Sequence, residues 1–213
     1  MAGTSARGRF ITFEGGEGAG KSTQIARLKL HLEAAGRAVL ATREPGGTPG
    51  AEQIRRLLVT GDPGRWDAWT EALLIAAARR DHVERVIRPA LAAGTWVLCD
   101  RFLDSTLAYQ GIVAGIGADA VEALHGLVFG RLRPDLTLVL DLDPAVGLER
   151  AGRRADGEGR FEARGLAFHQ KLREAFLAIA RAEPERCRVI DAARDVSSVE
   201  NDILRSVAET LDA

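Results

Sequence analysis

A glycine-rich segment near the N-terminus has the residue types and the spacing needed to hold phosphate. It spans residues 15–22, reads GGEGAGKS, and matches the pattern G-x-x-x-x-G-K-[ST]. Glycines let successive backbone N–H groups turn inward around an anion, and a following helix adds its positive N-terminal end. In this pattern we expect Lys21 to reach the β- and γ-phosphates and Ser22 to ligate Mg²⁺. The alternative is a glycine-rich turn that matches by chance.

The segments on both sides of this loop provide the strand and the helix that such a site requires. Residues 9–14 form an apolar run typical of a buried strand, and apolar side chains recur at helical spacing over 21–35. We therefore expect one continuous loop to bind the phosphates of ATP with its Mg²⁺. Its residues are Gly15, Gly16, Glu17, Gly18, Ala19, Gly20, Lys21, Ser22 and Thr23.

The whole chain alternates short apolar runs with longer helical patterns. We expect strands at 9–14, 38–42, 95–100, 136–141 and 188–191. We expect helices at 21–35, 51–59, 67–93, 118–129, 144–154, 162–182 and 196–211, the third being one or two helices with Pro89 as a kink. Apolar strands separated by helices indicate a parallel sheet covered on both faces. The predicted fold class is therefore α/β, a three-layer α/β/α arrangement around a five-stranded parallel sheet.

Polar residues gather after the third expected strand, where ligands collect in parallel sheets. Asp100 is placed to hold Mg²⁺ or its waters beside Ser22, and Arg101 to bind an acceptor phosphate. The alternative for this pair is a surface ion pair. Hydroxyl and amide groups that suit a base or sugar follow, or else a polar loop that caps a helix. These residues are Ser105, Thr106, Tyr109 and Gln110.

The composition sets limits on the class of protein. The chain has 213 residues, 46% of them hydrophobic, and a net charge of −1, which favours neither nucleic-acid nor membrane-surface binding. We expect residues 1–8 to be a disordered tail and 9–213 one domain, with no signal peptide or membrane span, hence a cytoplasmic protein. Cys99 and Cys187 are expected to be buried thiols, and no zinc-ligand spacing occurs.

Other nucleotide-binding classes fit less well. A guanine-reading Asn-Lys-x-Asp motif cannot occur, because the chain's single asparagine is Asn201, in the last expected helix. The chain is also short for a mechanical ATPase. A compact kinase with a second substrate pocket remains, and so does a small nucleotide-gated binding module.

Several segments occur in the order and spacing of bacterial thymidylate kinases, and the chain resembles that family from about residue 9 to 211. They are 13–15, 16–23, 42–48, 81–84, 86–91, 100–102, 105–111 and 133–144. The resemblance implies transfer of the ATP γ-phosphoryl group to dTMP, with Mg²⁺, by a homodimer. A kinase for another nucleoside or monophosphate acceptor remains the alternative.

The resemblance also implies roles for individual residues. Glu17 takes the position of an acid that approaches the sugar 3′-hydroxyl, Arg79 that of an arginine that reads a thymine carbonyl, and Arg101 that of the arginine on the dTMP phosphate. Without the resemblance, Arg79 and Arg80 on a helix would be expected on a solvated helix face. The tyrosine of the nucleoside-facing segment crowds the ribose 2′ position and so favours deoxyribose. The expected dTMP site comprises Glu17, Arg43, Ile75, Arg79, Arg101, Ser105, Thr106, Tyr109 and Gln110.

One position departs from the family pattern. Family members often carry a phenylalanine that stacks on thymine four residues before the Arg79 position, where this chain has Ile75. Aliphatic contact buries a base face but gives up a ring–ring contribution of about 1 kcal/mol. This departure is the main sequence feature that favours another acceptor.

Residues 149–164 are rich in arginine and glycine, which fits a charged surface loop or a lid over ATP. The arginines are Arg150, Arg153, Arg154, Arg160 and Arg164. Phosphoryl transfer needs cationic stabilisation. The resemblance implies a lid, since some bacterial thymidylate kinases carry their catalytic arginine there, while the eukaryotic type carries it in the phosphate loop, where this chain has Gly18. We expect Arg153 to act on the transition state, with Arg150 as second choice or in adenine stacking.

Overall fold

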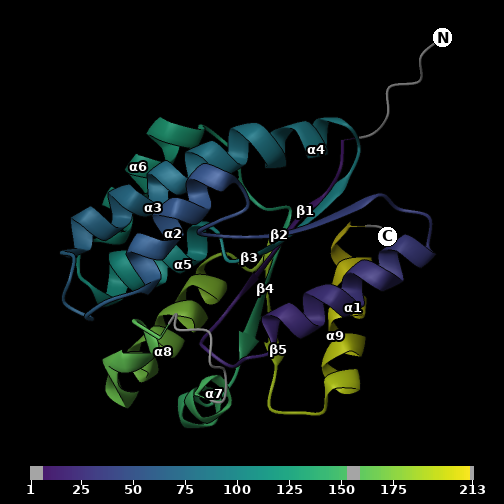
Figure 1. Cartoon of the computed structure of the whole chain (residues 1–213). Helices are drawn as coiled ribbons and strands as arrows, with labels where there is room; N and C mark the ends of the chain where they lie inside the picture. Colours follow the sequence, from purple (N-terminus) through teal and green to yellow (C-terminus); the bar gives the residue numbers. More distant parts are fainter. Residues whose placement is uncertain (1–6, 153–158, 212–213) are drawn as a thin grey trace.

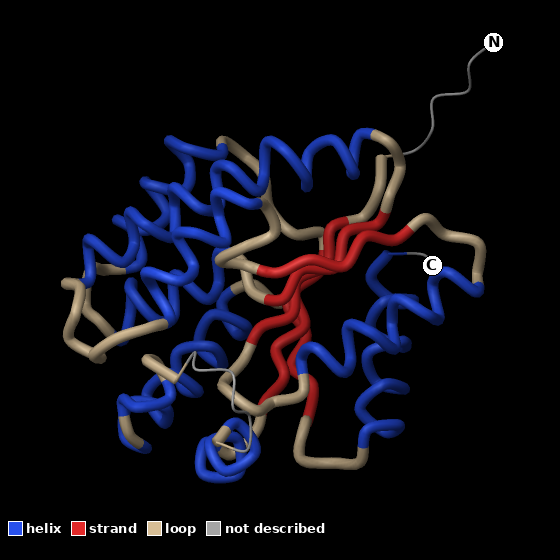
Figure 2. Tube along the Cα trace, viewed as in Figure 1, coloured by secondary structure: helices blue, strands red, loops and turns tan. Residues whose placement is uncertain are grey.

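The centre of the molecule is a single five-stranded sheet. The computed structural model describes residues 7–152 and 159–211. All neighbouring strands are parallel, in the order β2-β3-β1-β4-β5 (Figures 1 and 2). The strands are β1 (Phe10–Glu14), β2 (Val39–Arg43), β3 (Trp96–Asp100), β4 (Leu136–Asp141) and β5 (Cys187–Asp191). The predicted sheet is confirmed, and β2 extends to Arg43 because this residue still pairs with Asp100 of β3.

Helices cover both faces of the sheet, which confirms the three-layer α/β/α prediction (Figure 1). One face carries α1 (Lys21–Ala34) and α9 (Val196–Leu211). The other carries α3 (Ala68–His82), α4 (Arg88–Ala92), α5 (Leu103–Thr106), α6 (Ala118–Phe129) and α8 (Leu166–Ala182). Helix α2 (Pro49–Val59) packs on α3, and α7 (Pro144–Ala151) follows β4.

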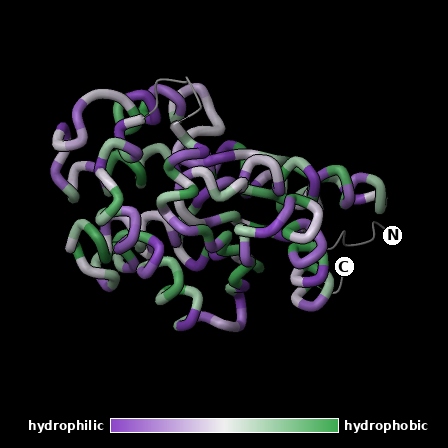
Figure 3. Tube along the Cα trace, turned by 90° about the horizontal axis from the view of Figure 1, so that it is seen from below, coloured by the Kyte–Doolittle hydropathy of each residue, from purple (hydrophilic) through white to green (hydrophobic). Residues whose placement is uncertain are grey.

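The two faces of β1 show why both layers form. Its side chains alternate, so Ile11 and Phe13 lie in the core beneath α1 and α9, while Phe10 lies in the core beneath the other helices. Hydrophilic and hydrophobic stretches alternate along the helices, as expected for helices that bury one side (Figure 3). Cys99 and Cys187 are both buried and free, as predicted.

The expected helix at 67–93 is continuous but not regular. After α3 the chain makes a π-helical turn, η1 (Val83–Ile87), and only then begins α4. Pro89 lies in the first turn of α4, where its missing N–H and its ring are tolerated. The π-helical turn just before α4 lies where we predicted a kink. None of the described helices is long and apolar enough to cross a bilayer.

Two other segments differ from prediction. Residues 103–113 form a helical segment, α5 followed by π-helical η2 (Leu107–Val113), because Leu103 and Leu107 are buried in the core although their sequence shows no long apolar period. The helix expected at 162–182 begins only at Leu166, after the 3₁₀ turn η3 (Glu162–Arg164), since Gly165 has a φ of 77°. Helix α7 ends at Ala151, and Arg153 and Arg154 lie outside the described residues.

The parallel register brings the polar strand ends to one edge of the sheet. Glu14, Asp100, Asp141 and Asp191 are the last residues of β1, β3, β4 and β5. This edge is the place where open α/β sheets hold their ligands.

Candidate active site

A cavity of about 540 Å³ opens at the carboxyl ends of β1 and β3. Its volume falls in the range of small-molecule sites, about 300–1,000 Å³. Most of the site residues expected from the sequence line it, namely Glu17, Gly18, Ala19, Gly20, Lys21, Ser22, Thr23, Arg43, Ile75, Arg79, Asp100, Arg101, Ser105, Thr106, Tyr109, Gln110 and Arg150. Gly15 and Gly16 line a smaller cavity behind the loop. Arg153 lies outside the described residues.

The loop between β1 and α1 packs closely against α7. A Cβ on Gly18, whose φ is 67°, would lie 2.1 Å from the carbonyl oxygen of Gly147, so no side chain fits there without displacing backbone. This loop therefore has no room for an arginine at the position where the eukaryotic type carries one. Lys21 is buried, and its Nζ donates to the carbonyl oxygens of Gly16 at 2.9 Å and Gly15 at 3.3 Å. Burial and the charge of Arg101 lower the pKa of Lys21.

Ser22 and Asp100 meet at the mouth of the loop. Ser22 Oγ donates to Asp100 Oδ2 at 3.2 Å, and Asp100 Oδ1 is buried without a hydrogen-bond partner among the described residues. Among these residues no group of three His, Cys, Asp or Glu side chains comes together. One hydroxyl, one carboxylate and phosphate oxygens are the hard ligands that Mg²⁺ uses in nucleotide sites, so this pair fits the ion.

Arg101 is held in place by three neighbours. Its Nη1 donates to the Gly15 carbonyl oxygen at 3.0 Å and to Ser105 Oγ at 3.1 Å, and its Nη2 donates to Glu17 Oε1 at 2.7 Å. Its φ of 67° is a left-handed backbone conformation that costs about 1–2 kcal/mol for a residue with a side chain. Strain of this kind is typical of functional positions, and here it turns the guanidinium toward the phosphate loop.

Glu17 joins this cluster from the loop. Tyr109 Oη donates to the same carboxylate oxygen at 2.9 Å. Burial alone would raise the pKa of Glu17, but the positive charges of Arg101 and Lys21 lower it to about 2. The carboxylate is therefore an acceptor at neutral pH, available to a substrate hydroxyl.

A buried acid supports the segment after β3 from behind. Glu14 is fully buried; its Oε1 accepts from the Phe102 backbone N–H at 2.7 Å and its Oε2 from Ser105 Oγ. Burial and the nearby charge of Asp104 raise the pKa of Glu14 to about 7. The sequence analysis placed Glu14 at the end of a strand but did not predict that it holds Phe102 and Ser105 in place.

Arg79 lies inside the protein rather than on a solvated helix face. It is 4% exposed, its Nε donates to Glu44 Oε2, and its Nη2 donates to the Phe102 carbonyl oxygen and to Thr106 Oγ1. The alternative of a solvated helix face is wrong for Arg79. Ile75, one turn earlier on α3, is half-buried and lines the same cavity.

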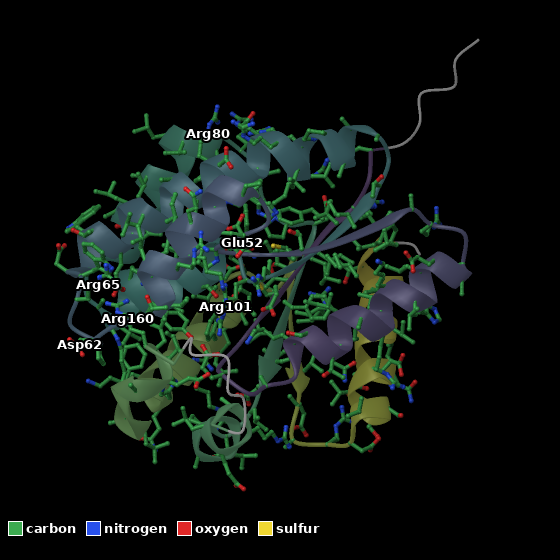
Figure 4. The ribbon with its side chains drawn as sticks, viewed as in Figure 1. Glu52, Asp62, Arg65, Arg80, Arg101 and Arg160 are labelled. Atoms are coloured by element: carbon green, nitrogen blue, oxygen red, sulfur yellow. The ribbon has the colours of Figure 1, made fainter. Side chains whose placement is uncertain are left out.

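Two of the expected lid arginines have structural partners. Arg160 is buried, and it donates to Glu71 and to the carbonyl oxygens of Leu58, Asp62 and Pro63. In Figure 4 its side chain lies beside Asp62, in the loop that joins α2 to α3. Arg164 also donates to Glu71 and to Pro63. Arg160 and Arg164 thus attach the C-terminal end of the 149–164 segment to Glu71 and to the backbone of residues 58–63. Arg150 alone lines the main cavity among the described residues of that set.

Eight residues that line the cavity were not among the site residues expected from the sequence, namely Glu44, Pro45, Arg55, Leu58, Val59, Phe102, Phe161 and Glu162. Glu44 and Pro45 lie in the family segment 42–48, to which the sequence analysis gives no role in the site beyond Arg43. Phe161 makes an edge contact with the ring of Tyr109, with centroids 5.4 Å apart. An aromatic residue beside a glycine-rich segment was the signal that could have identified it.

The phosphate loop, the strained arginine opposite it and the 2-3-1-4-5 parallel sheet together define a P-loop nucleotide phosphotransferase. The family model for thymidylate kinase matches residues 13–203. A thymidylate kinase of Caulobacter vibrioides is 60% identical over 193 residues, 91% of this chain and 92% of that protein. One of Magnetococcus marinus is 57% identical over 203 residues, 94% of this chain and 96% of that protein.

The fold agrees with these matches. The crystal structure of thymidylate kinase from Ehrlichia chaffeensis superposes with a TM-score of 0.76 at 33% identity, covering 93% of this chain and 98% of that one. The chain belongs to the thymidylate kinase family. Its activity is the family's, phosphorylation of dTMP to dTDP.

Proposed function

We propose that the cavity carries out this transfer with ATP on the side of the phosphate loop and dTMP on the side of Arg101. One observation carries the proposal. Lys21 Nζ and Arg101 Nη1 both donate to the carbonyl oxygen of Gly15, so the cation for the donor phosphates and the cation for the acceptor phosphate converge on one atom. Two phosphates bound by these cations lie next to each other, as an in-line transfer requires.

On the donor side, the backbone of residues 15–23 surrounds the ATP phosphates and Lys21 reaches the β- and γ-phosphates. Ser22 and Asp100 would hold Mg²⁺, which would supply positive charge to neutralise the ATP phosphates. The orphaned Asp100 Oδ1 supports this role, since a buried carboxylate oxygen without a partner is costly.

On the acceptor side, Arg101 binds the dTMP phosphate, and Glu17 accepts from the sugar 3′-hydroxyl. Tyr109, whose hydroxyl is fixed on Glu17, lies beside the ribose and leaves no room for a 2′-hydroxyl. Arg79, Thr106 and Gln110 face the base, with Ile75 against its plane, and Arg43 and Ser105 complete the site. The attacking phosphate oxygen is already largely ionised near pH 7, so no general base is needed.

We propose that residues 9–213 form one kinase domain with a lid at about 149–164. Arginines of this lid supply the positive charge that catalysis needs beyond Lys21 and Mg²⁺. Arg150 at the cavity wall supports this, and so does Gly18, whose crowded position keeps an arginine out of the loop. Arg153 is the proposed transition-state arginine and Arg150 contacts ATP. The extra positive charge stabilises the charge that spreads over the transferring phosphoryl oxygens.

We also propose that the active form is a homodimer. Large apolar side chains are exposed on the adjacent helices α3 and α6, including Trp69, Leu73 and Leu127, the last of them 85% exposed. A second copy of the chain would cover them. Sedimentation of the protein and of Leu127→Glu tests this, with a dimer expected for the first and a monomer for the second. A monomeric parent protein would contradict it.

The activity is tested by following ADP formation with Mg-ATP and a panel of acceptors, namely dTMP, dUMP, dCMP, dGMP and thymidine. Preference for dTMP is expected. Preference for another acceptor would assign the chain to a related kinase, and the absence of acceptor-dependent ADP formation would reduce it to a nucleotide-binding module.

A further inference from the structure

Glu71, on the inner side of α3, is a buried carboxylate that the proposed mechanism does not use. It is 1% exposed. Its Oε1 accepts from Arg160 Nη2 at 2.6 Å and from Arg164 Nη2 at 3.0 Å, and its Oε2 accepts from Gln110 Nε2 at 3.0 Å. A single carboxylate therefore connects the C-terminal end of the arginine-rich segment to Gln110 of η2.

The contact with Glu71 decides which way the Gln110 amide points. An amide offers a carbonyl oxygen at one end and an NH₂ group at the other, whereas a carboxylate that receives two guanidinium groups only accepts hydrogen bonds. The NH₂ end of Gln110 must therefore face Glu71, and the carbonyl end must face away. The chemistry of the pair fixes this assignment.

Within the described part of the chain, the carbonyl end of Gln110 has no hydrogen-bond partner. Gln110 lines the main cavity, and its Oε1 is buried without a hydrogen-bond donor among the described residues. A buried acceptor of this kind is costly unless a ligand supplies the missing donor. The amide is therefore set to accept a hydrogen bond from a base in the cavity.

We propose that Glu71 is a specificity-determining positioning residue, which holds the Gln110 amide so that the site requires an N–H donor on the base. The proposal rests on the proposed function, in which Gln110 faces the base. Thymine presents N3–H at its pairing edge. Cytosine presents N3 as an acceptor, which would oppose the Gln110 carbonyl and leave both acceptors unpaired.

Arg160 makes this arrangement rigid. Three backbone carbonyl oxygens, from Leu58, Asp62 and Pro63, accept hydrogen bonds from its guanidinium, and so does the carboxylate of Glu71. Because Arg160 cannot move without losing these bonds, Glu71 has one position, and the Gln110 amide has one orientation.

The test compares dTMP with 5-methyl-dCMP, which keeps the sugar, the phosphate and the methyl group and differs at positions 3 and 4 of the base. The ratio of the two kcat/KM values is measured for the parent protein, Glu71→Gln and Glu71→Asp. Glutamine at 71 can accept or donate, so it frees the Gln110 amide to turn. Aspartate keeps the negative charge but withdraws the carboxylate from its partners by one methylene. Arg160 is still held by three backbone carbonyl oxygens, whereas Gln110 loses its fixed acceptor, so this variant decides the question if Glu71→Gln does not fold.

The parent protein is expected to prefer dTMP strongly, and each Glu71 variant to lower that preference by about tenfold or more. The matched control is Arg164→Gln, which removes a partner from the other oxygen of Glu71 and should keep the preference. A ratio unchanged in both Glu71 variants overturns the proposal, even if their overall activity falls. An equal loss of preference in Arg164→Gln also overturns it, because the ratio would then follow buried charge and not the Gln110 contact.

Gln110→Leu separates this inference from the proposed function. Loss of preference in Gln110→Leu together with the Glu71 variants supports both. If Gln110→Leu loses the preference and the Glu71 variants keep it, the inference alone fails. If Gln110→Leu keeps the preference, the base contact assigned to Gln110 in the proposed function is wrong, and the inference fails with it.

Discussion

The carboxylate of Glu17 and the guanidinium of Arg101 lie 2.7 Å apart, joining the phosphate loop to the segment after β3. These residues are 84 positions apart in the chain. The pair fixes the acceptor arginine relative to the donor loop before either nucleotide binds. Such preorganisation lowers the entropic cost of aligning two phosphates.

This pair makes a prediction about acid stability. The pKa of Glu17 falls from an ordinary value of 4.5 to about 2 in the folded protein, so the unfolded chain binds more protons between these values. The stabilisation from ionised Glu17 is then complete above about pH 4.5 and is lost as the pH falls toward 2. In thermal unfolding from pH 7 to pH 2.5, Glu17→Gln should lose less of its Tm below pH 4.5 than the parent protein.

The control for this measurement is Glu209→Gln, at a carboxylate on the outer side of α9. It should follow the parent curve. Parallel curves for Glu17→Gln and the parent protein would contradict the depressed pKa of Glu17.

Local motifs made the loop and the arginine opposite it predictable. Residues 15–22 are contiguous, and Arg101 directly follows a strand whose apolar run is readable, so the parallel register alone brings the two together. The bond between Glu71 and Arg160 joins residues 89 positions apart, and neither lies in a pattern that marks it as a partner. Long-range ion pairs of this kind depend on tertiary packing, which the local hydrophobic periodicity of a sequence does not predict.

The same reason explains the missed helix and the burial of Arg79. Residues 103–113 are helical because Leu103 and Leu107 pack into the core, while their local sequence shows a polar cluster. Arg79 would read as exposed beside Arg80, yet Glu44 provides a buried partner for its charge. A buried arginine is stable only when such a partner exists, and the partner lies in a distant loop.

Replacement of Lys21 tests the phosphate cradle. Lys21→Ala should lower kcat by about 100-fold or more, because a fixed cation next to the transferring phosphoryl group is lost. Steady-state ADP formation with dTMP measures this. Lys171→Ala, at an exposed lysine on α8, is the control and should retain the parent rate. A near-normal kcat in Lys21→Ala would exclude Lys21 from the reaction.

Removal of Arg153 and removal of Arg150 should change different kinetic constants. Arg153→Ala should lower kcat more than it raises KM for dTMP, because its proposed contact forms in the transition state. Arg150→Ala should mainly raise KM for ATP if its contact is with bound ATP. Arg181→Ala, at an exposed arginine on α8, serves as control. An effect of Arg153→Ala confined to KM would mean that Arg153 only binds substrate.

Ile75 provides a gain-of-affinity prediction. Its side chain lines the cavity and is half-buried, so a ring at this position can extend toward the base without entering the core. Ile75→Phe should add ring–ring stacking on thymine worth about 1 kcal/mol, which is roughly a fivefold lower Kd for dTMP. Calorimetry with dTMP measures it, and Ile75→Leu controls for size without a ring. If the phenylalanine and leucine variants bind dTMP equally, Ile75 does not contact the plane of the base, and the assignment of the base to this wall of the cavity is wrong.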